Sequence, residues 1–175
     1  MNSISLHQIN FKSIIDNFDF FCKRNTPYAC HKSKELSKIT GGYFGDEISI
    51  IGGRPSMGKS SFLLNEHLDI SINQNVKSAF LSLQHTKHTL FPRIISMLQQ
   101  EDFSVSQYLN KSDSEQCIFT EELKKIDFQK LNFYEIYYPT IEELSKYIFE
   151  LTKNENIKIF FIDKLQLICY YHASR

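Results

Sequence analysis

Four residues within one short stretch have the types and the spacing needed to bind phosphate. The stretch fits the pattern G-x-x-x-x-G-K-[ST] with Gly53, Gly58, Lys59 and Ser60. Glycines permit close backbone approaches that a Cβ atom would block, so successive backbone N–H groups can face one anion. A helix that starts here would add its unpaired N–H donors and positive dipole end. In this pattern Lys59 would contact the β- and γ-phosphates of a nucleotide, and Ser60 would hold Mg²⁺.

The flanks of this loop supply the strand–turn–helix setting that the pattern requires. An isoleucine-rich run at residues 48–51 predicts a buried strand, and residues 61–65 continue as a helix. The alternative is a glycine turn in which the Lys–Ser pair is incidental. On the first interpretation ATP is the expected ligand, and the expected binding residues are Gly53, Arg54, Pro55, Ser56, Met57, Gly58, Lys59, Ser60 and Ser61.

A carboxylate follows a second apolar run, where residues 159–162 lead directly into Asp163. In nucleotide-hydrolysing proteins with this loop, an acidic residue at the end of an apolar strand orients Mg²⁺. The alternative is an aspartate at an ordinary strand end. Paired with the loop upstream, the run predicts that Ser60 and Asp163 form the metal site.

The remaining pattern alternates helices with short apolar strands. Apolar runs predict strands at 78–83, 131–138 and 157–162. Apolar residues at helical spacing predict helices at 11–23, 59–72, 89–100, 115–126 and 141–153. Thr140 and Glu143 form a capping box for the last helix, and residues 101–115 are expected to be loop. Pro92 is compatible with its helix only in the first turn.

This alternation predicts an α/β fold with a parallel sheet that carries helices on both faces. The phosphate site would then lie beyond the carboxyl ends of the strands.

The 175 residues suit one domain, and 20 basic residues balance 20 acidic ones, so composition does not indicate nucleic-acid binding. Four cysteines without a C-x-x-C pair favour free thiols in a reducing cytoplasm. No apolar run is long enough for a membrane span.

Residues 53–60, Gly-Arg-Pro-Ser-Met-Gly-Lys-Ser, resemble the phosphate loop of DnaB-type replicative DNA helicases. Residues 36–42, Leu-Ser-Lys-Ile-Thr-Gly-Gly, resemble the family's approach to its first core strand, and Gly45-Asp46 matches its turn. Leu90 and Arg93 fall where the family's next helix has the same residue types. Residues 162–167, Ile-Asp-Lys-Leu-Gln-Leu, are similar to the family's second nucleotide motif. The resemblance covers residues 36–168 and implies a RecA-like ATPase core that uses Mg-ATP in DNA replication.

Two residues depart from the family pattern within the expected site. The family's second strand ends in Ser-Leu-Glu, whose glutamate polarises the attacking water, whereas this chain has Gln84. A neutral amide can hold a water but accepts a proton very poorly, so the general-base contribution of about 10²–10⁴ in rate should be lost. Lys164 stands where the family has tyrosine; its cation could pair with Asp163 or point into solvent. Lys59 and Gln84 are therefore the residues expected at the catalytic positions, Lys59 at the phosphates and Gln84 in place of the family's glutamate.

The chain also ends soon after the Asp163 strand, whereas the family continues with further strands, DNA-contacting loops and an arginine that reaches the neighbouring subunit's ATP site. We therefore expect two parts: an N-terminal helix and linker at 1–35, and a partial RecA-like domain at 36–175, incomplete at its C-terminal side. The resemblance places the N-terminal helix where the family's linker helix docks on the next subunit. An uncovered sheet edge would need a partner, a covering tail or a homodimer.

These observations favour an ATP-binding domain of helicase type with weak or no hydrolysis and no unwinding on its own. The alternatives are a non-enzymatic interaction module, or the remnant of a decayed replicative helicase. Expected partners are another copy of the chain or a larger replication protein. Binding of single-stranded DNA is implied by the family resemblance alone.

Overall fold

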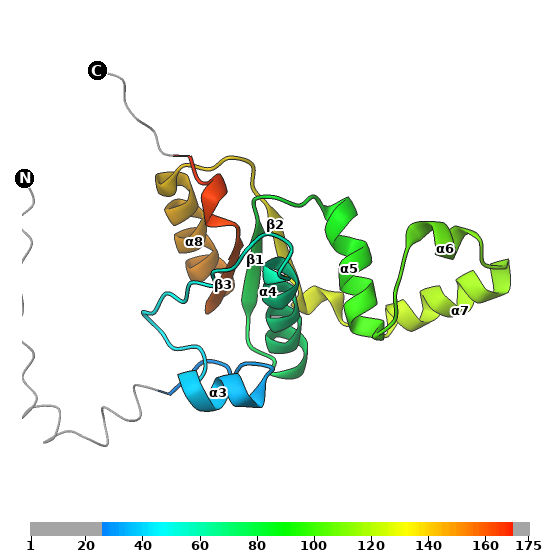
Figure 1. Ribbon diagram of the computed structural model, residues 1–175, viewed down its shortest axis with the longest axis horizontal. Helices are drawn as coiled ribbons and strands as arrows, with labels where there is room; N and C mark the ends of the chain where they lie inside the picture. The colour runs from blue at the N-terminus through cyan, green and yellow to red at the C-terminus, as the bar shows by residue number, and fades with distance from the viewer. Residues whose placement is uncertain (1–25, 170–175) are drawn as a thin grey trace, which may run out of the picture.

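The computed structural model describes residues 26–169 as an α/β domain built on a small parallel sheet (Figure 1). The strands are β1 (Ser78–Ser82), β2 (Asn132–Glu135) and β3 (Ile159–Asp163). They are arranged in the order β2-β1-β3, and both pairings are parallel. The register places Ser82 of β1 opposite Glu135 of β2 and Asp163 of β3, so all three strands end at one edge. The predicted fold class and all three of these strands are confirmed.

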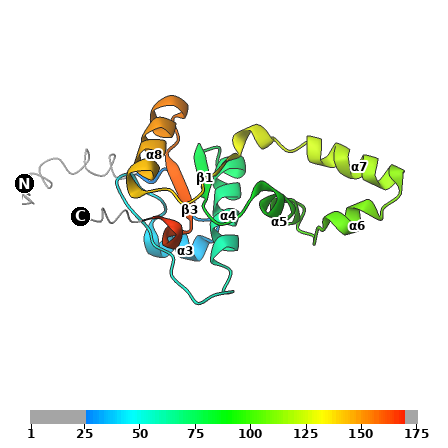
Figure 2. The same ribbon diagram turned by 90° about the horizontal axis from the view of Figure 1, so that it is seen from above.

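Helices cover both faces of this sheet (Figures 1 and 2). On one face lie α4 (Lys59–Leu68), which continues into the π-helical turn η1 (Asp69–Asn73), and α5 (Lys87–Gln99). On the other face lies α8 (Ile141–Glu155), which begins at the predicted capping box of Thr140 and Glu143. The other elements are α3 (Lys34–Thr40), α6 (Val105–Leu109), α7 (Asp113–Lys124) and the 3₁₀ turns η2 (Phe128–Lys130) and η3 (Leu165–Leu167).

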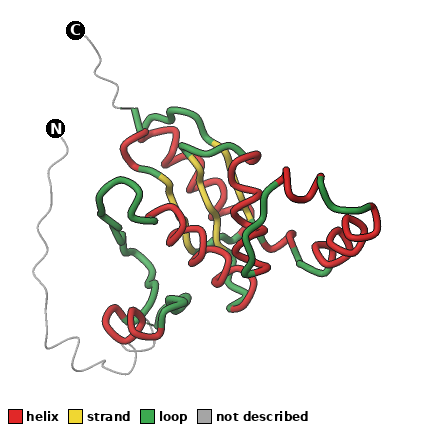
Figure 3. The backbone as a smooth tube through the Cα atoms, turned by 45° about the vertical axis from the view of Figure 1, so that its right-hand side comes forward, coloured by secondary structure: helices red, strands yellow, loops and turns green. Residues whose placement is uncertain are grey.

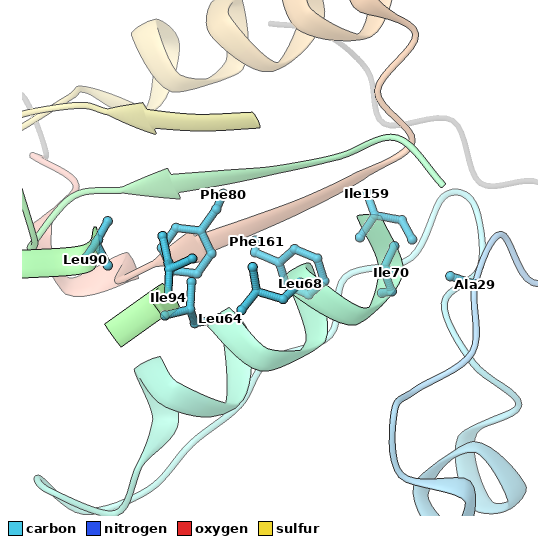
Figure 4. Packing of buried hydrophobic residues seen from close by; sticks show 9 residues of the cluster. All are labelled: Ala29, Leu64, Leu68, Ile70, Phe80, Leu90, Ile94, Ile159 and Phe161. Atoms are coloured by element: carbon cyan, nitrogen blue, oxygen red, sulfur yellow. The ribbon is translucent and has the colours of Figure 1, made fainter. Parts of the chain in front are cut away.

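The larger hydrophobic core lies between the sheet and helices α4 and α5 (Figure 4). Phe80 of β1 points from the sheet toward Leu64 of α4 and Ile94 of α5 and is fully buried. Phe161 of β3 lies beside Leu68 of α4. Burying one such side chain contributes roughly 1.5–3 kcal/mol. A second cluster on the α8 face contains Ala79, Leu81 and Leu144. Because β1 contributes to both clusters, its five residues are all buried.

A buried carboxylate ties the segment before the phosphate loop to α4. Glu66, 2% exposed, accepts hydrogen bonds from the Tyr43 hydroxyl (2.9 Å) and the Lys32 backbone N–H (3.1 Å), and pairs with His31 Nδ1 (3.0 Å). Burial and the nearby Glu66 carboxylate raise the pKa of Tyr43 above its usual value. Tyr43 also exchanges backbone hydrogen bonds with residues 28 and 29, so the chain is held firmly up to residue 43.

The strand predicted at residues 48–51 is wrong. These residues form no regular element, and Ile48, Ile50 and Ile51 are 90%, 75% and 40% exposed. Figure 3 shows the loop that contains them beside the three strands rather than within the sheet. An apolar run becomes a strand only where a neighbouring strand binds its backbone, and within residues 26–169 this run has no such neighbour.

Two smaller expectations also need correction. Helix α5 begins at Lys87, so Pro92 lies in its second turn rather than its first. Part of the segment expected to be loop forms α6, which starts where the Ser104 hydroxyl accepts a hydrogen bond from the Gln107 N–H. A five-residue helix capped in this way is too short to show helical periodicity.

The helix predicted at 11–23 lies outside the described residues, and the division at residue 35 stays a prediction. Within residues 26–169, none of the helices is long and apolar enough to cross a membrane.

Candidate functional site

The phosphate loop turns sharply into α4 without a side-chain cap. Ser56 and Gly58 have positive φ angles of 63° and 82°. Gly58 is the N-cap of α4, and its carbonyl oxygen accepts the Phe62 N–H at 2.8 Å. No side chain in the described part of the chain caps the first N–H groups of α4, so they are available to an anion. An ideal Cβ on Gly58 would meet no atom within 4 Å, so its conformation rather than crowding favours glycine.

Lys59 folds back over its own loop. Its Nζ donates to the carbonyl oxygens of Gly53 at 2.9 Å and Arg54 at 2.7 Å. Both acceptors are neutral and belong to exposed residues. A bound phosphate would offer the same ammonium a charged acceptor, and hydrogen bonds between ionised groups are roughly twice as strong as neutral ones. With a phosphate present, Lys59 would exchange these carbonyl partners for phosphate oxygens.

Asp163, at the end of β3, carries a buried oxygen without a partner. The residue is 3% exposed, and no group in the described part of the chain hydrogen-bonds its Oδ2 atom. Its backbone carbonyl accepts the Leu83 N–H at 2.7 Å, which holds the ends of β1 and β3 together. A buried carboxylate oxygen with no partner is costly unless it meets a cation or a donor. Mg²⁺ prefers oxygen ligands of this kind, so Asp163 fits the metal.

One cavity of about 1350 Å³ joins the loop to the strand ends. Lys59, Ser60, Gln84 and Asp163 all line it, so residues more than a hundred positions apart in sequence share one space. Most of the predicted loop residues line it as well, namely Gly53, Pro55, Ser56, Gly58 and Ser61. Arg54 and Met57 belong to the same loop but do not contribute to the walls.

The two departures from the family pattern lie at this cavity. Gln84 is exposed just beyond β1 and presents an amide where a proton acceptor would be needed. Lys164 also lines the cavity, and within the described residues it forms no ion pair with Asp163. Its cation therefore leaves the Asp163 oxygen open.

His85 also lines this cavity, and the sequence pattern did not single it out. Its backbone is fixed by Ser82, whose hydroxyl accepts the His85 N–H at 3.0 Å and donates to the His85 carbonyl at 2.6 Å. Burial, with Arg93 and Lys164 nearby, lowers the pKa of His85, and Asp163 opposes the shift. The ring is therefore neutral at pH 7. Its place one residue after Gln84 was the only signal in the sequence.

Comparison with protein families agrees with this geometry. Residues 31–175 match the family model described as DnaB-like helicase C terminal domain. The chain is also similar to curated proteins named replicative DNA helicase DnaB. It is 29% identical to the protein from Helicobacter pylori over 142 residues, which are 81% of this chain and 29% of that protein.

Two further relatives carry the same name. The protein from Rickettsia prowazekii is 28% identical over 139 residues, covering 73% of this chain and 28% of that protein. The protein from Treponema pallidum is 38% identical over 61 residues, covering 35% of this chain and 14% of that protein. The chain thus spans less than a third of the length of these relatives.

Proposed function

Because the chain belongs to the DnaB-like helicase C terminal domain family, we propose that it binds Mg-ATP at the phosphate loop and hydrolyses it slowly or not at all. The observation that carries this proposal is the meeting of Lys59, Ser60 and the unpartnered Asp163 oxygen at one cavity. The N–H groups at the start of α4 and the Lys59 ammonium would bind the phosphates. Ser60 and Asp163 would hold Mg²⁺, which neutralises phosphate charge when bound.

The experiment that tests this proposal is equilibrium binding of a fluorescent ATP analogue to the folded full-length chain, with Mg²⁺ and with a chelator. We expect binding that depends on Mg²⁺ and that unlabelled ATP displaces. A folded chain that binds no analogue would overturn the proposal.

Asp163→Asn should remove most of the benefit that Mg²⁺ gives to nucleotide binding. The amide keeps the shape of the side chain but loses the charge, so we expect the Mg²⁺-dependent gain in affinity to fall about tenfold, or about 1.4 kcal/mol. Binding measured with the chelator should be nearly unchanged. Asp127→Asn, at an exposed position before η2, is the matched control. An Asp163→Asn variant that keeps the full Mg²⁺ gain would exclude Asp163 from the metal site.

Gln84→Glu should raise ATP turnover only slightly in the isolated chain. The new carboxylate would restore a proton acceptor at the cavity, and such groups typically contribute about 10²–10⁴ in rate. However, the family resemblance assigns stabilisation of the phosphate charge to an arginine from a neighbouring subunit, which acts only in an assembly. We therefore expect less than about a tenfold gain, well below that range. A steady-state phosphate-release assay measures the gain in turnover, and the Lys59→Ala/Gln84→Glu variant gives the background rate to subtract. A hundredfold gain would mean that turnover in the isolated chain does not need the neighbouring arginine.

A second candidate function is a non-enzymatic interaction module within a replication assembly. The exposed isoleucines at residues 48–51 favour it, because a folded domain rarely leaves such a run in water without a contact to make. Under this alternative, the folded chain would bind a partner whether or not ATP and Mg²⁺ were present. Contact with single-stranded DNA is a further proposal and rests on the family resemblance.

A further inference from the structure

Strand β3 leads directly into a lysine at the nucleotide cavity. Lys164 follows Asp163, is half-buried, and lines the same cavity as the phosphate loop. Its backbone is held on both sides, because the Asp163 carbonyl oxygen accepts the Leu83 N–H at 2.7 Å and the Lys164 carbonyl oxygen accepts the Leu167 N–H at 3.1 Å. The ammonium group can therefore move only as far as its own side chain allows.

The positive charge of Lys164 has no anionic partner among residues 26–169. It forms no ion pair there, and neither does Arg93 of α5, which lines the same cavity. Both cations lie close enough to His85 to lower the pKa of its imidazole, and the Asp163 carboxylate is near enough to oppose them. Two cations and one carboxylate thus lie around His85, beyond the carboxyl ends of β1 and β3.

The terminal phosphates of a bound nucleotide would lie beside this group of charges. In loops of this pattern the lysine, here Lys59, contacts the β- and γ-phosphates. A metal ion held by a strand-end aspartate, here Asp163, bridges oxygens of the same two phosphates. Because Lys164 is next to Asp163 in the chain and lines the same cavity, its ammonium is placed nearer to these phosphates than to the α-phosphate.

The charges of the walls favour a ligand with several negative charges. Around the phosphate loop and the strand ends there are three cations, Lys59, Arg93 and Lys164, and one carboxylate, Asp163. The two other carboxylates of the cavity belong to residues 46–47, before the isoleucine run. A nucleoside triphosphate carries an additional negative charge compared with the diphosphate, and lysine or arginine side chains aimed at a terminal phosphate stabilise that charge.

We propose that Lys164 makes this chain prefer a nucleoside triphosphate over a diphosphate, by pairing with the terminal phosphate. The inference rests on the proposed function, because it requires a nucleotide at the phosphate loop. The contact is made within one chain and needs no residue of a neighbouring subunit. Tyrosine, which the family pattern has at this position, is uncharged at neutral pH and could not make the same pair. A diphosphate has no γ-phosphate to offer, so its affinity should depend little on Lys164.

The test is equilibrium binding of two fluorescent nucleotides to the folded full-length chain with Mg²⁺: a non-hydrolysable ATP analogue, and the ADP analogue with the same label. Lys164→Gln should weaken binding of the ATP analogue about tenfold, and binding of the ADP analogue less than about threefold. Lys164→Arg should keep most of the preference, because a guanidinium also pairs with phosphate oxygens. Circular dichroism of each variant checks that it is folded.

Lys158→Gln is the matched control. Lys158 lines the same cavity but lies just before β3, at the opposite end of the strand from Lys164. The two residues are about 20 Å apart along an extended chain, at roughly 3.3 Å per residue. A charge beyond the Debye length of about 8–10 Å is largely screened, so Lys158→Gln should change both affinities less than about twofold.

The possible results separate this inference from the proposed function. A wild-type chain that binds neither nucleotide overturns both. If the wild type binds the ATP analogue, but Lys164→Gln weakens both nucleotides equally or neither, the inference is wrong while the proposed function stands. Tighter ATP binding by Lys164→Gln would mean that the lysine competes with Mg²⁺ for Asp163, which also overturns the inference. So does an equal effect of Lys158→Gln, which would assign the preference to the overall charge of the cavity.

Discussion

Lys59→Ala is expected to weaken Mg-ATP binding by roughly 30-fold to 100-fold, because a hydrogen bond between ionised groups contributes about 2–3 kcal/mol. The Nζ atom lies over the loop at 2.9 Å and 2.7 Å from two carbonyl oxygens, which a phosphate would replace as acceptors. Removing it takes no partner from the core, since Gly53 and Arg54 are exposed. The loss should therefore appear in binding and not in the free energy of unfolding.

Titration of a fluorescent ATP analogue with Mg²⁺ measures this loss, and urea unfolding of the same samples checks the fold. Lys111→Ala, which removes an exposed lysine near α7, should bind as the wild type does. Lys59→Arg should recover part of the affinity, because the charge returns but the planar guanidinium does not reproduce the compact ammonium. Equal affinities for Lys59→Ala and the wild type would mean that the phosphate loop does not bind nucleotide in this chain.

The parts of the fold that sequence predicted best are those whose signals are local. The capping box of Thr140 and Glu143 starts α8 where expected, because both partners lie within four residues of each other. Apolar runs at 78–83 and 157–162 contain β1 and β3; all five residues of β1 are buried, whereas in β3 Phe160 and Ile162 are only half-buried. Asp163 is the last residue of β3, as the apolar run before it indicates.

Residues 48–51 show what a local signal cannot predict. Their composition favours a strand, but a strand also needs a neighbour, and the described part of the chain places no strand beside them. The same limit applied to His85, whose proximity to Arg93 and Asp163 arises only when β1, β3 and α5 come together. The free Oδ2 of Asp163 likewise became visible only once its surroundings were known.

A second large effect is expected on stability. Acidification should destabilise the domain because of His67. The imidazole is fully buried on α4 and hydrogen-bonds Ser78 Oγ through Nδ1 at 2.8 Å, while its Nε2 has no partner in the described residues. Among the described residues, its hydrogen-bond and ring partners are uncharged: two serines and three phenylalanines, namely Ser71, Ser78, Phe80, Phe133 and Phe161. Burial in this setting lowers the pKa of His67 to about 3.

The lowered pKa sets the direction of the effect. Well above pH 6.5 the imidazole is neutral in both the folded and the unfolded chain, so it does not make stability depend on pH there. Between pH 6.5 and about 3 the unfolded chain binds a proton that the folded chain excludes, and the free energy of unfolding falls. The loss between pH 7 and pH 4.5 should reach roughly 2–3 kcal/mol at 1.36 kcal/mol per pH unit.

Urea unfolding of His67→Gln and of the wild type between pH 7 and pH 4.5 measures how much His67 contributes to the pH dependence of the free energy of unfolding. Glutamine retains a group that can hydrogen-bond Ser78 but cannot take up a proton in this range. The variant should be less stable at pH 7, yet its stability should decline less steeply as pH falls. His88→Gln, at an exposed position on α5, should follow the wild-type curve. If His67→Gln and the wild type lose stability in parallel, the acid sensitivity comes from other groups, and His67 accepts a proton in the folded chain.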